Sequence, residues 1–113
     1  MRIVLQRGDL TDQCVDAIVN PTNGRLRRAG GVDAVFHRRG GPALPSDCRA
    51  LLAGRHGDGL PVGQAVATTG GDLPARWVNH TVGPAYSSSE DRTESLVSGY
   101  RQSLQVADAG SKM

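Results

Sequence analysis

The chain has 113 residues, of which 38% are hydrophobic and 21% charged, and its formal net charge is +2. This length suits a single domain over residues 1–113 with a real hydrophobic core, and the small net charge does not indicate a dedicated nucleic-acid binder. No run of residues approaches the roughly 18 apolar residues of a membrane span, and the first ten residues lack the apolar core of a signal peptide. We therefore expect a soluble cytoplasmic protein that does not bind a membrane.

The N-terminal part of the chain predicts two strands. The first covers Ile3–Leu5, and Thr11–Gln13 then favours a short helical turn because Thr and Asp are good N-caps. The second strand is expected over Cys14–Val19. Its apolar residues do not alternate cleanly with polar ones, which predicts burial on both faces as in a parallel or mixed sheet.

The remaining residues alternate between helical and extended patterns. Between the glycine pairs Gly30-Gly31 and Gly40-Gly41, apolar residues recur at helical spacing (Val32, Val35 and Phe36). Further elements are expected as a helix over 43–54 capped by Ser46 or Asp47, strands over 63–69 and 76–82, and a helix over 94–107 ending at Gly110. This order predicts a three-layer α/β/α domain with a mixed sheet. Because no strand follows the last helix, we expect C-terminal strands and a helix to be missing.

Two loops are candidate ligand sites, because ligands of open α/β sheets bind beyond the carboxyl ends of the strands. One loop follows the first predicted strand, and the other covers 20–31. The second loop ends at a helix N-terminus, where free N–H groups attract phosphate. The amides of Asn20 and Asn23 facing the acid Asp33 suit a polyhydroxy ligand such as a ribose. Alternatively, Asp33 only stabilises the helix dipole, by about 0.3–1 kcal/mol.

Other chemically active side chains allow structural interpretations. Cys14 and Cys48 lack the spacing of a metal site or a disulfide framework, so we expect buried or free thiols and no metal. His37 can contact Asp33 at the i,i+4 spacing, and both it and His80 are expected to be structural histidines. Five arginines form either a solvated face or an anion-attracting rim: Arg25, Arg27, Arg28, Arg38 and Arg39.

Four motifs in the chain resemble those of the macrodomain family, specifically its ADP-ribosyl-hydrolase (MacroD-type) branch. They are GDLT at Gly8–Thr11, VDAIVNPTN at Val15–Asn23, GGVDAVFHRRGG at Gly30–Gly41 and LPARWVNHTVGP at Leu73–Pro84. The resemblance implies hydrolysis of ADP-ribose from modified protein side chains, or deacetylation of O-acetyl-ADP-ribose, without a cofactor or a metal. The expected partners are accordingly ADP-ribose, ADP-ribosylated proteins and O-acetyl-ADP-ribose.

The resemblance also implies roles for individual residues. Asp9 would accept a hydrogen bond from the adenine amino group, and Leu10 would offer its backbone N–H to the same ring. Backbone N–H groups for the pyrophosphate and distal ribose region would come from Gly30, Gly31 and Val32. Asn23 would hold the distal ribose, and Asp33 would orient or activate the attacking water. Asn20 remains a candidate ligand-binding residue that mainly shapes the turn.

The sequence departs from the family's pattern in three places. Residues Leu26–Ala29 replace a glycine-rich run, and Pro21-Thr22 replaces a pair of small residues. The family's second phosphate-binding loop, rich in Ser, Thr and Gly, would follow where this chain stops. These departures leave open a binding module that reads ADP-ribose without turnover, and more remotely a nucleic-acid binder that uses the arginine cluster.

Overall fold

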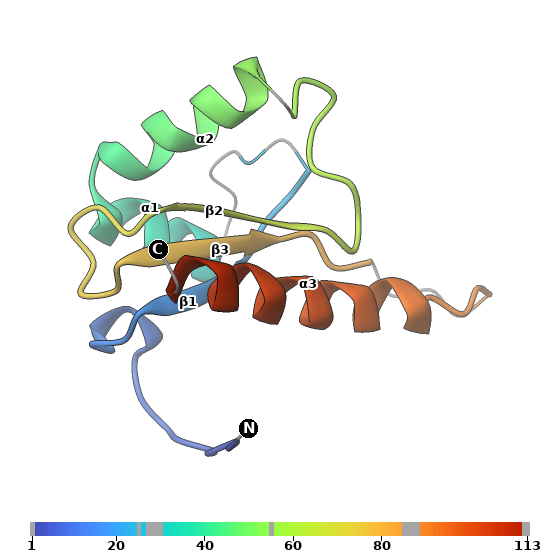
Figure 1. The fold of residues 1–113 in the computed structure, drawn as a ribbon, viewed down its shortest axis with the longest axis horizontal. Helices are drawn as coiled ribbons and strands as arrows, with labels where there is room; N and C mark the ends of the chain where they lie inside the picture. Colours follow the sequence, from blue (N-terminus) through green and yellow to red (C-terminus); the bar gives the residue numbers. More distant parts are fainter. Residues whose placement is uncertain (1, 25, 27–30, 55, 85–88, 112–113) are drawn as a thin grey trace.

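The computed structural model describes residues 2–24, 26, 31–54, 56–84 and 89–111. In chain order, its elements are η1 (Leu10–Asp12), β1 (Ala17–Pro21), α1 (Val32–Gly40), α2 (Ala43–Ala53), β2 (Ala65–Thr69), β3 (Trp77–Thr81) and α3 (Thr93–Ser111) (Figure 1). From β1 onward, this is the alternation of strands and helices that the sequence predicts.

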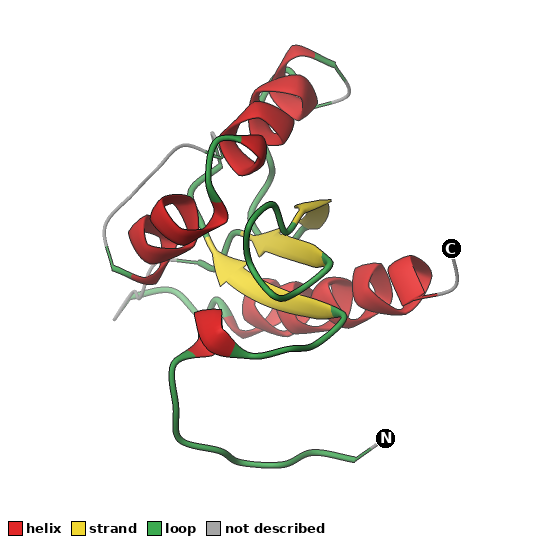
Figure 2. Cartoon of the chain, turned by 90° about the vertical axis from the view of Figure 1, so that its left-hand side faces the viewer, coloured by secondary structure: helices red, strands yellow, loops and turns green. Residues whose placement is uncertain are grey.

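The described strands form a mixed sheet in the order β1–β3–β2. β3 runs parallel to β1 and antiparallel to β2, and His80 of β3 lies opposite both Asn20 of β1 and Val66 of β2. The sheet lies between α3 on one side and α1 with α2 on the other (Figure 2). The predicted α/β/α arrangement with a mixed sheet is therefore confirmed.

The strands divide their side chains between the two helical layers, because successive residues of a strand point to opposite faces. Asn79 donates a hydrogen bond to the Ser103 carbonyl of α3 at 3.2 Å, so the face of the sheet that carries the Asn79 side chain packs against α3. The opposite face packs against α1 and α2. The buried apolar side chains of this layer come from the sheet and from the helices, and they include Ile18, Phe36, Leu44 and Val78. Burial of each large side chain contributes about 1.5–3 kcal/mol, so this layer holds α1 in place.

The strand expected over Ile3–Leu5 is absent, and this prediction is wrong. Residues 2–7 belong to no helix or strand, and the side chains of Ile3 and Leu5 are 87% and 101% exposed. The segment extends away from the rest of the molecule (Figure 1). An isolated extended segment gains neither ladder hydrogen bonds nor a buried face, and no described strand lies beside it to provide them.

The second strand lies further along the chain than expected. It covers Ala17–Pro21 instead of Cys14–Val19, and it alternates buried and exposed residues where burial on both faces was expected. Asn20 is consequently a fully buried strand residue and not a turn residue. Pro21 is compatible with this strand because β1 forms an edge of the described sheet, where a missing N–H breaks no ladder bond.

Three predicted helix caps are also wrong. Asp9, and not Thr11 or Asp12, caps the turn η1 through its bond to the Thr11 N–H. The N-cap of α2 is Pro42, while Asp47 lies inside that helix and accepts a hydrogen bond from the Thr69 N–H of β2. In α3, Gly110 lies within the helix instead of ending it. A side chain supplies the cap at η1, whereas α2 begins without a side-chain cap bond.

Candidate functional site

Polar side chains from all three described strands form one row on the face of the sheet that packs against α1 and α2. The strand register aligns Asn20 with His80, while Thr68 lies opposite Val78, two residues before His80. All three polar side chains are buried, with exposed fractions of 3% or less. Buried polar groups must find hydrogen-bond partners, so this row is a strong local constraint on the fold.

Asp33 faces this row from the first turn of α1. The helix begins after Gly31, whose φ of 65° lies in the left-handed region that favours glycine. Asp33 is only 2% exposed, and its Oδ1 accepts a hydrogen bond from Asn20 Nδ2 at 2.6 Å. The Asp33 side chain is thus held in place by a hydrogen bond from the neighbouring strand, in the first turn of α1.

Two histidines flank the Asp33–Asn20 pair. His37 Nε2 lies 3.4 Å from Asp33 Oδ1, which is a contact at the predicted i,i+4 spacing and too long for a strong hydrogen bond. His80 Nδ1 lies 3.1 Å from Asn20 Nδ2, and its Nε2 lies 2.9 Å from Thr68 Oγ1. Burial, with a smaller effect of nearby His37, lowers the pKa of His80 to about 4. The His80 imidazole is therefore neutral near pH 7.

Cys48 of α2 closes the buried cluster on the other side of His80. Its Sγ lies 4.0 Å from His80 Nε2. Burial and the nearby Asp33 and Asp47 raise the pKa of the Cys48 thiol to about 11. A thiol with so high a pKa is a poor nucleophile, and Cys48 acts as a small buried side chain here. Cys14 is exposed, and neither cysteine forms a disulfide, as predicted.

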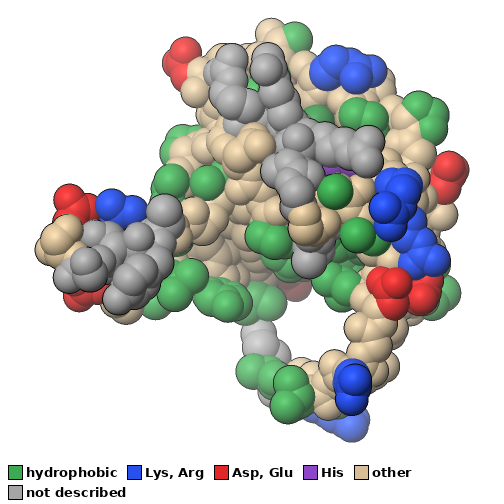
Figure 3. Space-filling view, turned by 180° about the vertical axis from the view of Figure 1, so that it is seen from behind, with side chains coloured by type: hydrophobic (Ala, Val, Ile, Leu, Met, Phe, Trp, Pro, Cys, Tyr) green, Lys and Arg blue, Asp and Glu red, His purple; other side chains and the backbone are tan. Residues whose placement is uncertain are grey.

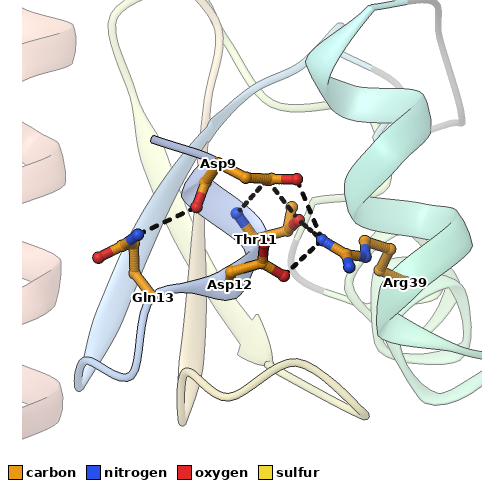
Figure 4. Close-up of polar contacts among 5 residues, drawn as sticks. All are labelled: Asp9, Thr11, Asp12, Gln13 and Arg39. Atoms are coloured by element: carbon orange, nitrogen blue, oxygen red, sulfur yellow. Dashed lines mark hydrogen bonds and ion pairs between the residues drawn. The ribbon is translucent and has the colours of Figure 1, made fainter. Parts of the chain in front are cut away.

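A second group of side chains surrounds Asp9, the residue expected at the adenine (Figure 4). Asp9 Oδ1 accepts hydrogen bonds from the N–H and the hydroxyl of Thr11, and its Oδ2 lies 3.2 Å from Arg39 Nη1. Arg39 also pairs with Asp12 at 2.7 Å. The bonds from Thr11, and to a smaller degree Arg39, lower the pKa of Asp9. Asp9 is thus an exposed, ionised acceptor whose second oxygen is shared with Arg39.

The other predicted site residues lie in less constrained surroundings. Asn23 is exposed in the turn that follows β1, where its carbonyl accepts a hydrogen bond from the Leu26 N–H. Leu10 is the first residue of η1 and is half-exposed. Gly31 and Val32 form the start of α1, whereas Gly30 lies outside the described residues. The structure thus brings Asn20 to Asp33 and puts Gly31 next to the same helix terminus.

The arginine cluster is only partly described, since Arg25, Arg27 and Arg28 lie outside the described residues. Arg38 is exposed, and Arg39 is paired as above. In the space-filling view, basic and acidic side chains lie next to one another along the right-hand edge of the molecule (Figure 3). The pairing of Arg39 with two acids reduces its attraction for an anion.

His80 and Thr68 were missed as functional candidates by the sequence reasoning. Each is the fourth residue of a five-residue strand and is buried, and a buried polar residue there predicts either a defect or a hydrogen-bond network. That signal exists in the sequence, but the partners of the network follow only from the strand register. Among the described residues, no group of three or more His, Cys, Asp or Glu could hold a metal ion, and none of their helices could cross a membrane.

Taken together, the fold and the site define a class of protein: an α/β/α domain with a buried acid at a helix N-terminus, next to the carboxyl end of a parallel strand. Comparison with known proteins identifies the family within this class. The family model named Macro domain matches residues 19–111. The chain therefore belongs to the macro domain family.

Individual relatives agree with this assignment. A macro domain-containing protein of Streptomyces nogalater is 60% identical over 105 residues, which cover 93% of this chain and 58% of the relative. The O-acetyl-ADP-ribose deacetylase of Shigella dysenteriae serotype 1 is 44% identical over 111 residues, or 97% of this chain and 62% of the relative. The Oceanobacillus iheyensis macrodomain with ADP superimposes with a TM-score of 0.84 at 35% identity, over 90% of this chain and 55% of that one. The chain thus spans about three fifths of these proteins.

Proposed function

We propose that this chain binds ADP-ribose and hydrolyses it from modified protein side chains, or removes the acetyl group of O-acetyl-ADP-ribose. The observation that carries the proposal is the buried Asp33 carboxylate, held by Asn20 at the N-terminus of α1. The Shigella relative named as an O-acetyl-ADP-ribose deacetylase and the Oceanobacillus macrodomain with ADP support it. The MacroD-type motifs of the sequence agree with the same branch of the family.

The proposed chemistry needs a water directed at the reacting carbon. In cleavage at the anomeric carbon of a ribose, the transition state resembles an oxocarbenium ion, as in glycoside hydrolysis. The Asp33 carboxylate would orient or activate the water and would lie near the developing positive charge, while Asn23 would hold the distal ribose. In deacetylation, the same pocket would direct the water at the acyl carbon.

The remaining ligand contacts would follow the length of ADP-ribose. Asp9 would accept a hydrogen bond from the adenine amino group, and Leu10 would donate its backbone N–H to the ring. Backbone N–H groups of Gly30, Gly31 and Val32 would bind the pyrophosphate and distal ribose region at the start of α1. Modified proteins are the proposed macromolecular partners, and the cytoplasm is the proposed location.

One observation favours a second candidate function, a module that binds ADP-ribose without turnover. Asp33 is 2% exposed and already bonded to Asn20, so its carboxylate has little surface at which a water could be held. In that case, the same residues would shape the pocket and catalyse nothing.

Two measurements on the full chain separate these functions. The first is calorimetric titration with ADP-ribose, and the second is chromatographic detection of ADP-ribose released from a peptide with an ADP-ribosylated glutamate. Binding together with release of ADP-ribose from the peptide, or of acetate from O-acetyl-ADP-ribose in a parallel assay, supports the hydrolase. Binding without either release supports the reader module. An absence of binding rejects both.

A further inference from the structure

We propose that His80 and Thr68 are positioning residues for Asp33, and that they act through the side-chain amide of Asn20. This inference deepens the proposed function, since it concerns the acid that would direct the water. The inference depends on which groups donate and which accept hydrogen bonds between Thr68, His80, Asn20 and Asp33. The distances between neighbouring groups allow these roles to be assigned one after another.

The first step is the orientation of the Asn20 amide. Its Nδ2 lies 2.6 Å from Asp33 Oδ1 and 3.1 Å from His80 Nδ1. The NH₂ group has two protons, one for each of these neighbours. If the amide were turned over, its carbonyl oxygen would face the Asp33 oxygen, and two acceptors would be pressed together. Asn20 therefore donates to both Asp33 and His80.

The second step is the tautomer of His80. Because Nδ1 accepts the proton of Asn20, a neutral imidazole carries its own proton on Nε2. Nε2 then donates to Thr68 Oγ1, 2.9 Å away. The Thr68 hydroxyl proton is in turn directed to the Thr69 carbonyl at 3.1 Å. The chain of bonds runs without conflict from a main-chain carbonyl of β2 to the carboxylate of α1.

The third step concerns the charges that face His80. Asp33 and His37 approach from α1, Cys48 approaches from α2, and Asn20 and Thr68 approach from the two neighbouring strands. A cationic imidazole would carry a proton on Nδ1 as well, and this proton would oppose the N–H of Asn20. Burial of the ring disfavours that form, so the donor order is kept near neutral pH.

The functional consequence is a fixed position for the acid. A carboxylate that directs a water must be held to within a fraction of an ångström, because a small displacement of a reacting group lowers the rate strongly. Asn20 alone could rotate about its side chain. With His80 fixed by Thr68, the amide has one orientation, in which an N–H of Asn20 is directed at Asp33 Oδ1.

The tautomer of His80 gives the most direct test and requires no activity. In the full chain labelled with ¹⁵N-histidine, NMR should show the His80 ring protonated on Nε2 and unprotonated on Nδ1 from pH 8 down to pH 6. A ring protonated on Nδ1 would overturn the proposal, because Asn20 could then not donate to it while facing Asp33.

A matched pair of variants tests the connection from Thr68 to Asp33. Thr68→Val keeps the shape of the side chain but removes the hydroxyl, whereas Thr68→Ser keeps the hydroxyl. In Thr68→Val, the ¹³C signal of the Asp33 carboxyl and the side-chain amide signals of Asn20 should shift, and in Thr68→Ser they should return towards the wild-type values. Unchanged signals in a folded Thr68→Val protein would overturn the proposal. If Thr68→Val does not fold, the His80 tautomer of the wild-type protein decides.

Turnover adds a separate readout. With the ADP-ribosylated peptide, kcat of Thr68→Val should fall by about tenfold with KM little changed, and Thr68→Ser should restore it. If the wild-type protein releases nothing while the NMR signals behave as expected, the proposed hydrolase function fails and the positioning of Asp33 stands. If the wild-type protein is active and Thr68→Val is equally active, the positioning role fails and the hydrolase function stands.

Discussion

Asn20 Nδ2 lies 2.6 Å from Asp33 Oδ1, although the two residues are 13 positions apart in the chain. One belongs to a strand and the other to the first turn of the next helix, so this bond fastens α1 to the carboxyl end of β1. It also fixes the acid to which the proposed chemistry assigns the attacking water. The stability of this chain and its proposed function therefore involve the same buried pair.

Acid should destabilise the fold through His80. The pKa of this imidazole is about 4 in the folded chain, against an ordinary value of 6.5, so the unfolded chain takes up the proton first as the pH falls. The contribution of His80 to the free energy of unfolding is fully present above about pH 6.5 and is lost towards pH 4. A shift of this size corresponds to about 3 kcal/mol.

Urea denaturation at a series of pH values measures this effect. The variant His80→Gln should show a weaker decline in the free energy of unfolding between pH 6.5 and pH 4, and His56→Gln, in the loop before β2, serves as the control. A wild-type stability that stays constant over this range would show that His80 is not buried as a neutral ring.

The two cysteines should differ sharply in reactivity. Cys14 is exposed, whereas Cys48 is 2% exposed with a pKa raised to about 11. A colorimetric thiol reagent should therefore modify one thiol quickly in the native chain and two in denaturant. The variant Cys14→Ser should leave no fast reaction. Two fast thiols in the native wild-type protein would contradict the packing of α2 against His80.

Gly71 should not tolerate a side chain. Its φ of 58° lies in the left-handed region, and a Cβ at this position would meet the Gly40 carbonyl oxygen at the end of α1. Gly71→Ala should therefore lower the free energy of unfolding by about 1–3 kcal/mol. In Gly83→Ala, a Cβ would meet no described atom within 4 Å, so this variant should unfold close to the wild-type urea concentration. Equal losses in both variants would contradict the packing of the 70–72 turn on α1.

Asp9 should contribute to the affinity for ADP-ribose if its carboxylate accepts the adenine amino group. Removal of a hydrogen bond to a charged acceptor costs about 1.5–3 kcal/mol, so Asp9→Ala should weaken the calorimetric Kd by about ten- to a hundredfold. Asp9 also caps η1 through Thr11, and Thr11→Val provides the matched control because it disturbs the turn but keeps the acceptor. A loss as large in the control would assign the effect to the turn.

Much of the fold could be predicted from the sequence because its helices and strands carry local signals. The apolar spacing of α1 and the glycines on either side of it define a helix that the structure confirms. The strand at Ile3–Leu5 fails for a non-local reason, since a strand exists only with a neighbour to pair with. Apolar composition alone could not show that this neighbour is absent from the described residues.

The site was predictable in part for the same reason. Asp33 stands out because it lies in the first turn of a helix that follows a glycine pair, and its contact with His37 follows from helical spacing. By contrast, the buried partners of Asn20 on the sheet depend on the register of β1, β3 and β2. This register places His80, 60 residues further along the chain, beside Asn20, and Thr68, 48 residues further along than Asn20, contacts His80 from β2. Neither the strand register nor the later start and end of β1 could be read from the residues themselves.

The proposed role of Asp33 is to direct a water at ADP-ribose bound to this chain, and the variant Asp33→Asn removes the carboxylate while keeping the size of the side chain. Release of ADP-ribose from a peptide with an ADP-ribosylated glutamate should fall by about a hundredfold or more, because a general base or water-orienting acid contributes 10²–10⁴-fold. The calorimetric affinity for ADP-ribose should stay within about an order of magnitude of the wild-type value, since the carboxylate acts mainly in the transition state. Wild-type turnover in a folded Asp33→Asn protein would contradict this role and leave Asp33 as a structural acid of the first helical turn.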